Sequence, residues 1–133
     1  MTLAEIKNQC MFQTNNDPED VGDYLPHLVD YINDGYDRLM NAWSKTHIPA
    51  GEYDRLEFDT DEPELPEWTH RALADWATWL IYRNGNPQKQ QRGYAFREAF
   101  ERILSNIADE GGADGLNEDG TRKIIKKFFN IPR

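Results

Sequence analysis

The chain has 133 residues, of which 24 are acidic and 15 are basic, so its formal net charge is −9. At this length we expect one domain that buries about two thirds of the surface of the unfolded chain. The single cysteine excludes an intramolecular disulfide and a cysteine zinc cluster, and the acidic balance argues against bulk binding to nucleic acid or anionic lipid. The sequence shows neither a secretory signal nor an apolar stretch of membrane-spanning length, so we expect a soluble protein made in the cytoplasm.

The first predicted helix spans about residues 2–12. Leu3, Ile6 and Cys10 fall at helical spacing. Thr2 followed by Glu5 has the pattern of a capping box, which satisfies free backbone N–H groups where a helix begins. On such an amphipathic helix Cys10 is expected to be a small core residue.

The second predicted helix runs from about Asp23 to Lys45 and has the clearest pattern in the chain. Apolar residues recur at steps of three and four for five turns, while polar residues fill the other face. Pro26 is tolerable in the first turn, where its missing N–H has no helical partner. Gly35 is expected to permit the close approach of a neighbouring backbone, or else a local kink. The apolar stripe consists of Leu25, Leu28, Val29, Ile32, Tyr36, Leu39, Met40 and Trp43.

Residues 46–66 form a long acidic connection, here called the acidic loop. Tyr53, Leu56 and Phe58 alternate within it and are compatible with a short extended piece. Asp59 and Asp61 resemble a fragment of a calcium ligand set, but the glycine and glutamate of an EF-hand loop are missing. A solvated, repulsive loop, or one that meets a basic partner, is therefore favoured over calcium binding.

The third and fourth predicted helices form an antiparallel hairpin. The segment from Pro66 to about Asn84 is apolar over most of its circumference, so we expect this helix to be central. Its tryptophans are expected to pack in the core, with Trp68 partly exposed. Gly85 is expected to end the third helix, and Asn86 to cap the fourth. The apolar stripe of that helix consists of Phe96, Ala99, Phe100, Ile103, Leu104 and Ile107, and Glu98 with Arg102 is a favourable pair outside it.

The sequence offers no pattern typical of an active site. His27, His47 and His70 lie on different predicted elements without metal-ligand spacing, and the two serines have no nucleophile turn around them. The acids are expected in loops and on outer faces, away from an apolar pocket that would separate their pKa values. We therefore predict a protein that is not an enzyme and that has no cofactor and no metal site.

The end of the chain is the best functional candidate. Residues 1–119 carry a net charge of −14, whereas residues 120–133 carry five bases and no acid. Residues 111–120 are rich in glycine and are predicted to be a flexible linker. The following segment, residues 121–133, is compatible with helix or strand. It is expected either to fold back on the acidic body or to dock on another chain as a basic, apolar arm. The arm residues are Arg122, Lys123, Ile124, Ile125, Lys126, Lys127, Phe128, Phe129, Ile131 and Arg133.

The pattern of the helices resembles that of head–tail connector, or adaptor, proteins of tailed bacteriophages and prophages. The likeness covers about residues 2–110 and rests on the helix order and on VDYINDGYDRLMNAW, RALADWATWLIYRN, the NGNP turn and RGYAFREAFERIL. It implies a small helical bundle that assembles as a ring on the portal and joins the capsid to the tail. The acidic loop has no counterpart that we can match in this family.

We therefore predict an all-α fold with about four helices in residues 1–110 and a flexible basic C-terminal arm. The expected function is that of a structural neck protein, made in the bacterial host cytoplasm and located in the virion neck. Its expected partners are further copies of itself, the portal protein and a downstream neck or tail protein, with no sequence-specific nucleic acid and no membrane. The alternative is a non-enzymatic interaction or regulatory protein encoded by a prophage or another mobile element.

Overall fold

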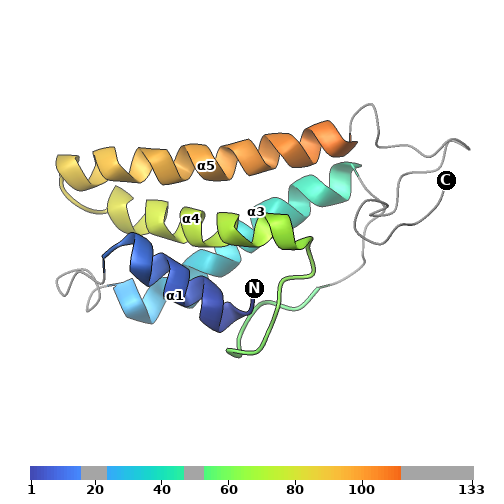
Figure 1. The fold of residues 1–133 in the computed structure, drawn as a ribbon, viewed down its shortest axis with the longest axis horizontal. Coiled ribbons are helices and arrows are strands. Elements are labelled where there is room, and N and C mark those ends of the chain that lie inside the picture. Colours follow the sequence, from blue (N-terminus) through green and yellow to red (C-terminus); the bar gives the residue numbers. More distant parts are fainter. Residues whose placement is uncertain (16–23, 47–52, 112–133) are drawn as a thin grey trace, which may run out of the picture.

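The structure is a computed structural model that describes residues 1–15, 24–46 and 53–111. These residues form four α-helices, with the labels of Figure 1: α1 (Leu3–Gln13), α3 (Leu28–Thr46), α4 (Glu67–Arg83) and α5 (Pro87–Gly111). A short 3-10 helix, Leu25–His27, precedes α3. Within the described ranges there is no strand, so the predicted all-α bundle is confirmed. The predicted arm, Arg122 to Arg133, lies outside the described residues.

Helix α4 is the centre of the bundle. It lies between α5 on one side and α1 on the other, and α3 crosses behind it (Figure 1). All of its residues from Ala72 to Tyr82 are buried. This segment, which the sequence shows to be apolar around most of the helix, thus forms the central helix, as predicted. Only a helix that is covered on every side can bury so many of its positions.

The turn between α4 and α5 is short, so the two helices are antiparallel neighbours. Asn86 caps α5 as predicted, since its side-chain oxygen accepts the N–H of Lys89 at 2.9 Å. Helix α4 ends at Arg83, and its C-cap residue is Asn84 rather than the predicted Gly85. Further along α5, Gly93 lies where an added Cβ would come within 2.9 Å of Tyr82 and 2.8 Å of the Trp79 ring. A glycine at that position therefore lets α5 approach α4 closely.

The second predicted helix is interrupted near its start. Tyr24 is helical, a 3-10 turn follows over Leu25–His27, and α3 continues from Leu28, while Asp23 lies outside the described residues. The role expected of Gly35 is also corrected. The group that approaches it is the Trp76 side chain, whose nearest atom would lie 3.1 Å from an added Cβ, and not a neighbouring backbone.

Helix α1 has the predicted start and the predicted face. The Thr2 side chain accepts the N–H of Glu5, and the Glu5 carboxylate accepts the N–H of Thr2, which completes the capping box. Leu3, Ile6 and Cys10 are buried, as the helical spacing predicts.

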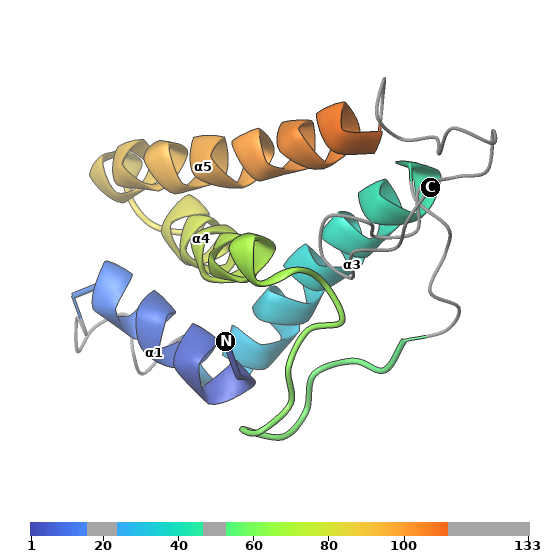
Figure 2. The same ribbon diagram turned by 45° about the vertical axis from the view of Figure 1, so that its right-hand side comes forward.

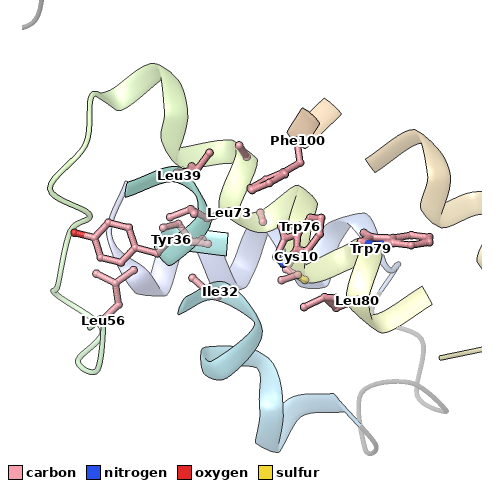
Figure 3. Close-up of a cluster of buried hydrophobic side chains, with 14 of the residues drawn as sticks. Cys10, Ile32, Tyr36, Leu39, Leu56, Leu73, Trp76, Trp79, Leu80 and Phe100 are labelled. Carbon is pink, nitrogen blue, oxygen red and sulfur yellow. The ribbon is translucent and has the colours of Figure 1, made fainter. Parts of the chain in front are cut away.

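The described part of the acidic loop, residues 53–66, follows the surface of the bundle as an irregular segment (Figure 2). Leu56 is buried, whereas Phe58 is 67% exposed. Two residues on the same face of an extended strand would share one environment, so the extended piece considered for Tyr53–Phe58 is not present. Leu56 instead closes one end of the core beside Tyr36, and Trp79 lies at the other end (Figure 3).

Candidate functional site

The acidic loop is attached to the bundle through Asn33, a buried polar residue of α3. Its side-chain amide donates to the carbonyl of Leu56 at 2.9 Å, and its side-chain oxygen accepts the N–H of Leu56 at 2.8 Å. Asn33 therefore satisfies both backbone groups of Leu56. Without these bonds the buried backbone polar groups would carry a desolvation cost.

Two tyrosines hold the rest of this segment. The Tyr36 hydroxyl accepts the N–H of Glu64 at 2.8 Å, and the Tyr53 hydroxyl donates to Asp37 at 2.6 Å. Burial raises the pKa of Tyr36 to about 12, so its hydroxyl stays neutral at physiological pH. The acidic loop is thus attached to α3 at several points, which differs from the solvated, repulsive loop that its charge favoured.

The aspartates that resembled a calcium ligand set have partners within the protein. Asp61 accepts the backbone N–H groups of Glu57 and Phe58 at 2.9 and 2.8 Å, and these hydrogen bonds lower its pKa. Asp59 pairs with Lys7 at 2.7 Å. Among the described residues, no group of three or more His, Cys, Asp or Glu side chains is arranged to hold a metal ion. The carboxylate of Asp61 fixes the local turn of the chain.

His70 is buried, although the sequence pattern indicated an ordinary surface or boundary histidine. Its Nε2 lies 2.6 Å from the carbonyl of Leu65, a contact that requires a hydrogen on Nε2. Its Nδ1 is then free to accept from the Met1 amino group at 2.8 Å. Both ring nitrogens therefore connect the start of α4 to its surroundings, which is a structural role.

A buried polar chain joins α1 to α4. Gln13 donates to Asp75 at 2.8 Å and accepts from the Thr78 hydroxyl at 2.6 Å, and the Cys10 sulfur lies 3.3 Å from that hydroxyl. Because Thr78 gives its hydrogen to Gln13, the Cys10 thiol is the donor to Thr78. Burial raises the pKa of Asp75, and it raises the pKa of the Cys10 thiol to about 11. Cys10 is a core residue, as predicted, whereas the expectation that acids stay on outer faces is wrong for Asp75.

A groove of about 540 Å³ opens between α3, α4 and α5. We call it the tryptophan groove, after Trp76 and Trp79 of α4. The Arg38 guanidinium lies 4.6 Å from the centre of the Trp76 ring, and that of Arg97 lies 5.5 Å from the Trp79 ring. These are cation–π distances. The groove is lined by Arg38, Trp76, Trp79, Arg83, Arg97, Phe100, Glu101 and Leu104.

Most charged groups of the tryptophan groove are already paired. Asp34 accepts from the Trp76 indole at 2.6 Å and from Arg38 at 3.0 Å. Partial burial favours a higher pKa for Asp34, but these two hydrogen bonds outweigh it and hold the pKa below its usual value. Arg97 pairs with Glu101 at 2.7 Å, in place of the pair expected between Glu98 and Arg102. Arg83 has no ion pair within the part of the chain that the structure describes, although its charge also helps to lower the pKa of Asp34.

Two surface segments of the molecule differ in charge. Residues 82–102, the hairpin segment, contain five basic and two acidic side chains, a net charge of +3. Residues 53–66 of the acidic loop contain six acidic side chains and one basic, a net charge of −5. Figures 1 and 2 show the α4–α5 turn at one end of the bundle and the tip of this loop below it, beside the start of α1. The sequence pattern placed a basic segment only in the arm, and the basic character of the hairpin segment was missed.

The tip of the acidic loop also carries an apolar side chain. Phe58 is two thirds exposed and lies between Glu57 and Asp59. Trp68 is 38% exposed, which confirms the prediction for that tryptophan. Aromatic side chains are enriched at the centres of protein–protein contacts.

No family model, curated protein or solved structure matches this chain. None of the helices in the described residues is long and apolar enough to cross a membrane. The ten arm residues from Arg122 to Arg133 lie beyond the described residues, so their docking role stays a prediction.

Proposed function

We propose that the chain is a structural neck protein of a tailed bacteriophage or prophage, a head–tail connector that assembles as a ring on the portal and joins the capsid to the tail. The proposal is supported by the resemblance in helix order and by one observation in particular. A helical body carries a net charge of −5 in the acidic loop, beside the start of α1, and of +3 in the hairpin segment.

Opposite charges on two different surfaces suit subunits that associate head to tail. In such a heterologous contact two different surfaces of the same chain meet, and a suitable rotation between neighbours closes the assembly into a ring. Electrostatic complementarity guides the encounter and disfavours contacts between like surfaces. A two-fold dimer would instead bring each charged surface against the same surface of the other subunit, where like charges repel. The exception is a dimer in which the acidic loop of each subunit meets the hairpin segment of the other at the same time.

The basic arm, Arg122 to Arg133, has a place in this proposal as a clasp on the portal or on an adjacent subunit. Its isoleucines and phenylalanines would supply apolar anchors, and its lysines would direct it to an acidic surface. The linker of residues 111–120 would span roughly 15–20 Å as a flexible coil, which is enough to reach a neighbouring subunit.

The test is co-expression with the portal protein encoded beside this gene, followed by purification through the portal and electron microscopy. A connector gives a ring of extra density beneath the portal, and deletion of residues 120–133 removes that density. The matched control is the Phe12→Ser variant, which changes an exposed side chain outside the arm and should leave the ring intact.

Two results would contradict the proposal. One is a gene position within a replication or lysogeny cluster, and the other is a failure of the full chain to bind any portal. Binding to one non-structural protein as a monomer or dimer would favour the alternative, a regulatory or interaction protein of a mobile element.

A further inference from the structure

We infer that the tryptophan groove receives the tip of the acidic loop of a second copy of this chain, with Phe58 as the inserted side chain. The inference rests on the proposed function, because it names the surfaces through which neighbouring subunits would meet. Within one subunit these surfaces are separate: the groove is lined by residues of α3, α4 and α5, whereas the loop tip is fastened to α3 and to the start of α1.

The tryptophan groove has the chemistry to hold an aromatic side chain flanked by acids. Trp76 and Trp79 line it with aromatic surface, and Tyr94 stacks on Trp79 at a ring distance of 5.3 Å. Arg83, which has no ion pair in the described ranges, lies on its edge. An inserted aromatic ring would gain offset or edge contacts with these rings, and an adjacent carboxylate would meet the Arg83 guanidinium.

The loop tip has the complementary chemistry, and its conformation is fixed. Glu57, Phe58 and Asp59 place an exposed ring between two carboxylates. Asp61 holds the backbone N–H groups of Glu57 and Phe58, and the carbonyl of Asp59 accepts the N–H of Ala4 at 3.1 Å. A tip that is already ordered loses little conformational entropy when it binds.

The occupant must come from another copy. The acidic loop is fastened to α3 by Asn33 and to the start of α1, where the carbonyl of Asp61 accepts the N–H of Leu3 at 2.7 Å. These bonds hold the tip against α1 and α3, and no residue of the acidic loop is among those that line the groove. Each subunit therefore offers one tip and one groove to different neighbours, which is a heterologous contact.

The experiment uses the full chain without any portal protein. Sedimentation at about 0.5 mM protein and low salt should show concentration-dependent self-association that weakens as salt is added. Phe58→Ser and Arg83→Glu should each weaken this association by about tenfold or more, because aromatic and arginine side chains dominate interface energies. The matched controls are Phe12→Ser, a phenylalanine that is 72% exposed elsewhere, and Arg71→Glu, an exposed arginine of the same helix. Both should associate like the unchanged chain.

Mixing the two variants gives a sharper test. Phe58→Ser keeps an intact groove and Arg83→Glu keeps an intact tip, so each alone should stay monomeric while a mixture forms a one-to-one heterodimer that grows no further. A photo-crosslinking amino acid at position 58 should form bonds between copies, at Trp76, Trp79 or their neighbours in the groove.

Three outcomes would overturn the inference: no self-association at 0.5 mM, equal effects from the control variants, or crosslinks that map outside the groove. If the chain still forms a ring on the portal in any of these cases, the proposed function stands and only the tip-in-groove contact fails. If the chain self-associates as described but binds no portal, the proposed function fails and the contact stands.

Discussion

Replacing Asn33 by alanine should destabilise the protein by removing two hydrogen bonds between α3 and the acidic loop, while the loop stays packed on the bundle. The substitution removes the partners of both the N–H and the carbonyl of Leu56, which lie 2.8 and 2.9 Å from the Asn33 side chain. Leu56 itself is only 1% exposed. An unsatisfied buried polar group costs about 1–3 kcal/mol. With two such groups and partial access of water, we expect a loss of about 2–4 kcal/mol.

The assay is urea unfolding, analysed for both the midpoint and the slope, together with hydrogen exchange of the Leu56 amide. The midpoint should fall and the slope should stay constant, because the surface exposed on unfolding is almost unchanged. The Leu56 amide should exchange faster than in the unchanged chain. Asn41→Ala is the matched control, because Asn41 is an exposed asparagine of the same helix.

The reasoning would be refuted if Asn33→Ala and Asn41→Ala unfolded within about 0.5 kcal/mol of each other, the range usual for surface substitutions. Asn33→Asp separates the two bonds to Leu56. It keeps an oxygen to accept the N–H of Leu56 but sets a second oxygen against the carbonyl. This variant should therefore also be less stable than the unchanged chain.

Three further predictions follow from the packing and from the buried polar chain. Gly93→Ala should lower the urea midpoint and destabilise the protein by about 1–3 kcal/mol, because the added Cβ overpacks against Trp79 and Tyr82 of α4. Asp75→Asn should raise the free energy of unfolding more at pH 7 than at pH 3. Burial raises the pKa of Asp75 in the folded state, so the folded protein loses stability as the pH rises above the ordinary aspartate range, and an equal effect at both pH values would contradict this. The thiol of Cys10, with a pKa of about 11, should react with a thiol reagent only after unfolding, and rapid labelling of the native protein would show that the core opens.

The helices could be predicted because their signals are local. The period of apolar residues in α3, the capping box of α1 and the asparagine cap of α5 each depend on residues within a few positions of one another. The central place of α4 also follows from its own composition. The start of α3 was less predictable, because Pro26 is compatible with the first turn of either an α-helix or a 3-10 helix.

The features that differ from prediction depend on contacts between distant residues. Asn33 and Leu56 are 23 positions apart. Nothing in the sequence indicates that the Asn33 side chain forms hydrogen bonds with the backbone of Leu56. Gly35 meets a tryptophan side chain of another helix, which the pattern of α3 alone does not reveal. Asp75 lies on the helix whose other faces are apolar, and only its contact with Gln13 of α1 explains why a carboxyl group is tolerated there.

The charge of the molecule shows the same dependence on three-dimensional placement. A net charge of −14 over residues 1–119 describes a uniformly acidic body, and such a body would repel copies of itself at every contact. The described part of the acidic loop holds six of the acids, beside the start of α1, and the hairpin segment holds five bases. Repulsion between copies is then strongest where like surfaces meet, while unlike surfaces attract within about a Debye length. A chain that is acidic as a whole can therefore still bind its own copy, provided that the contact is head to tail.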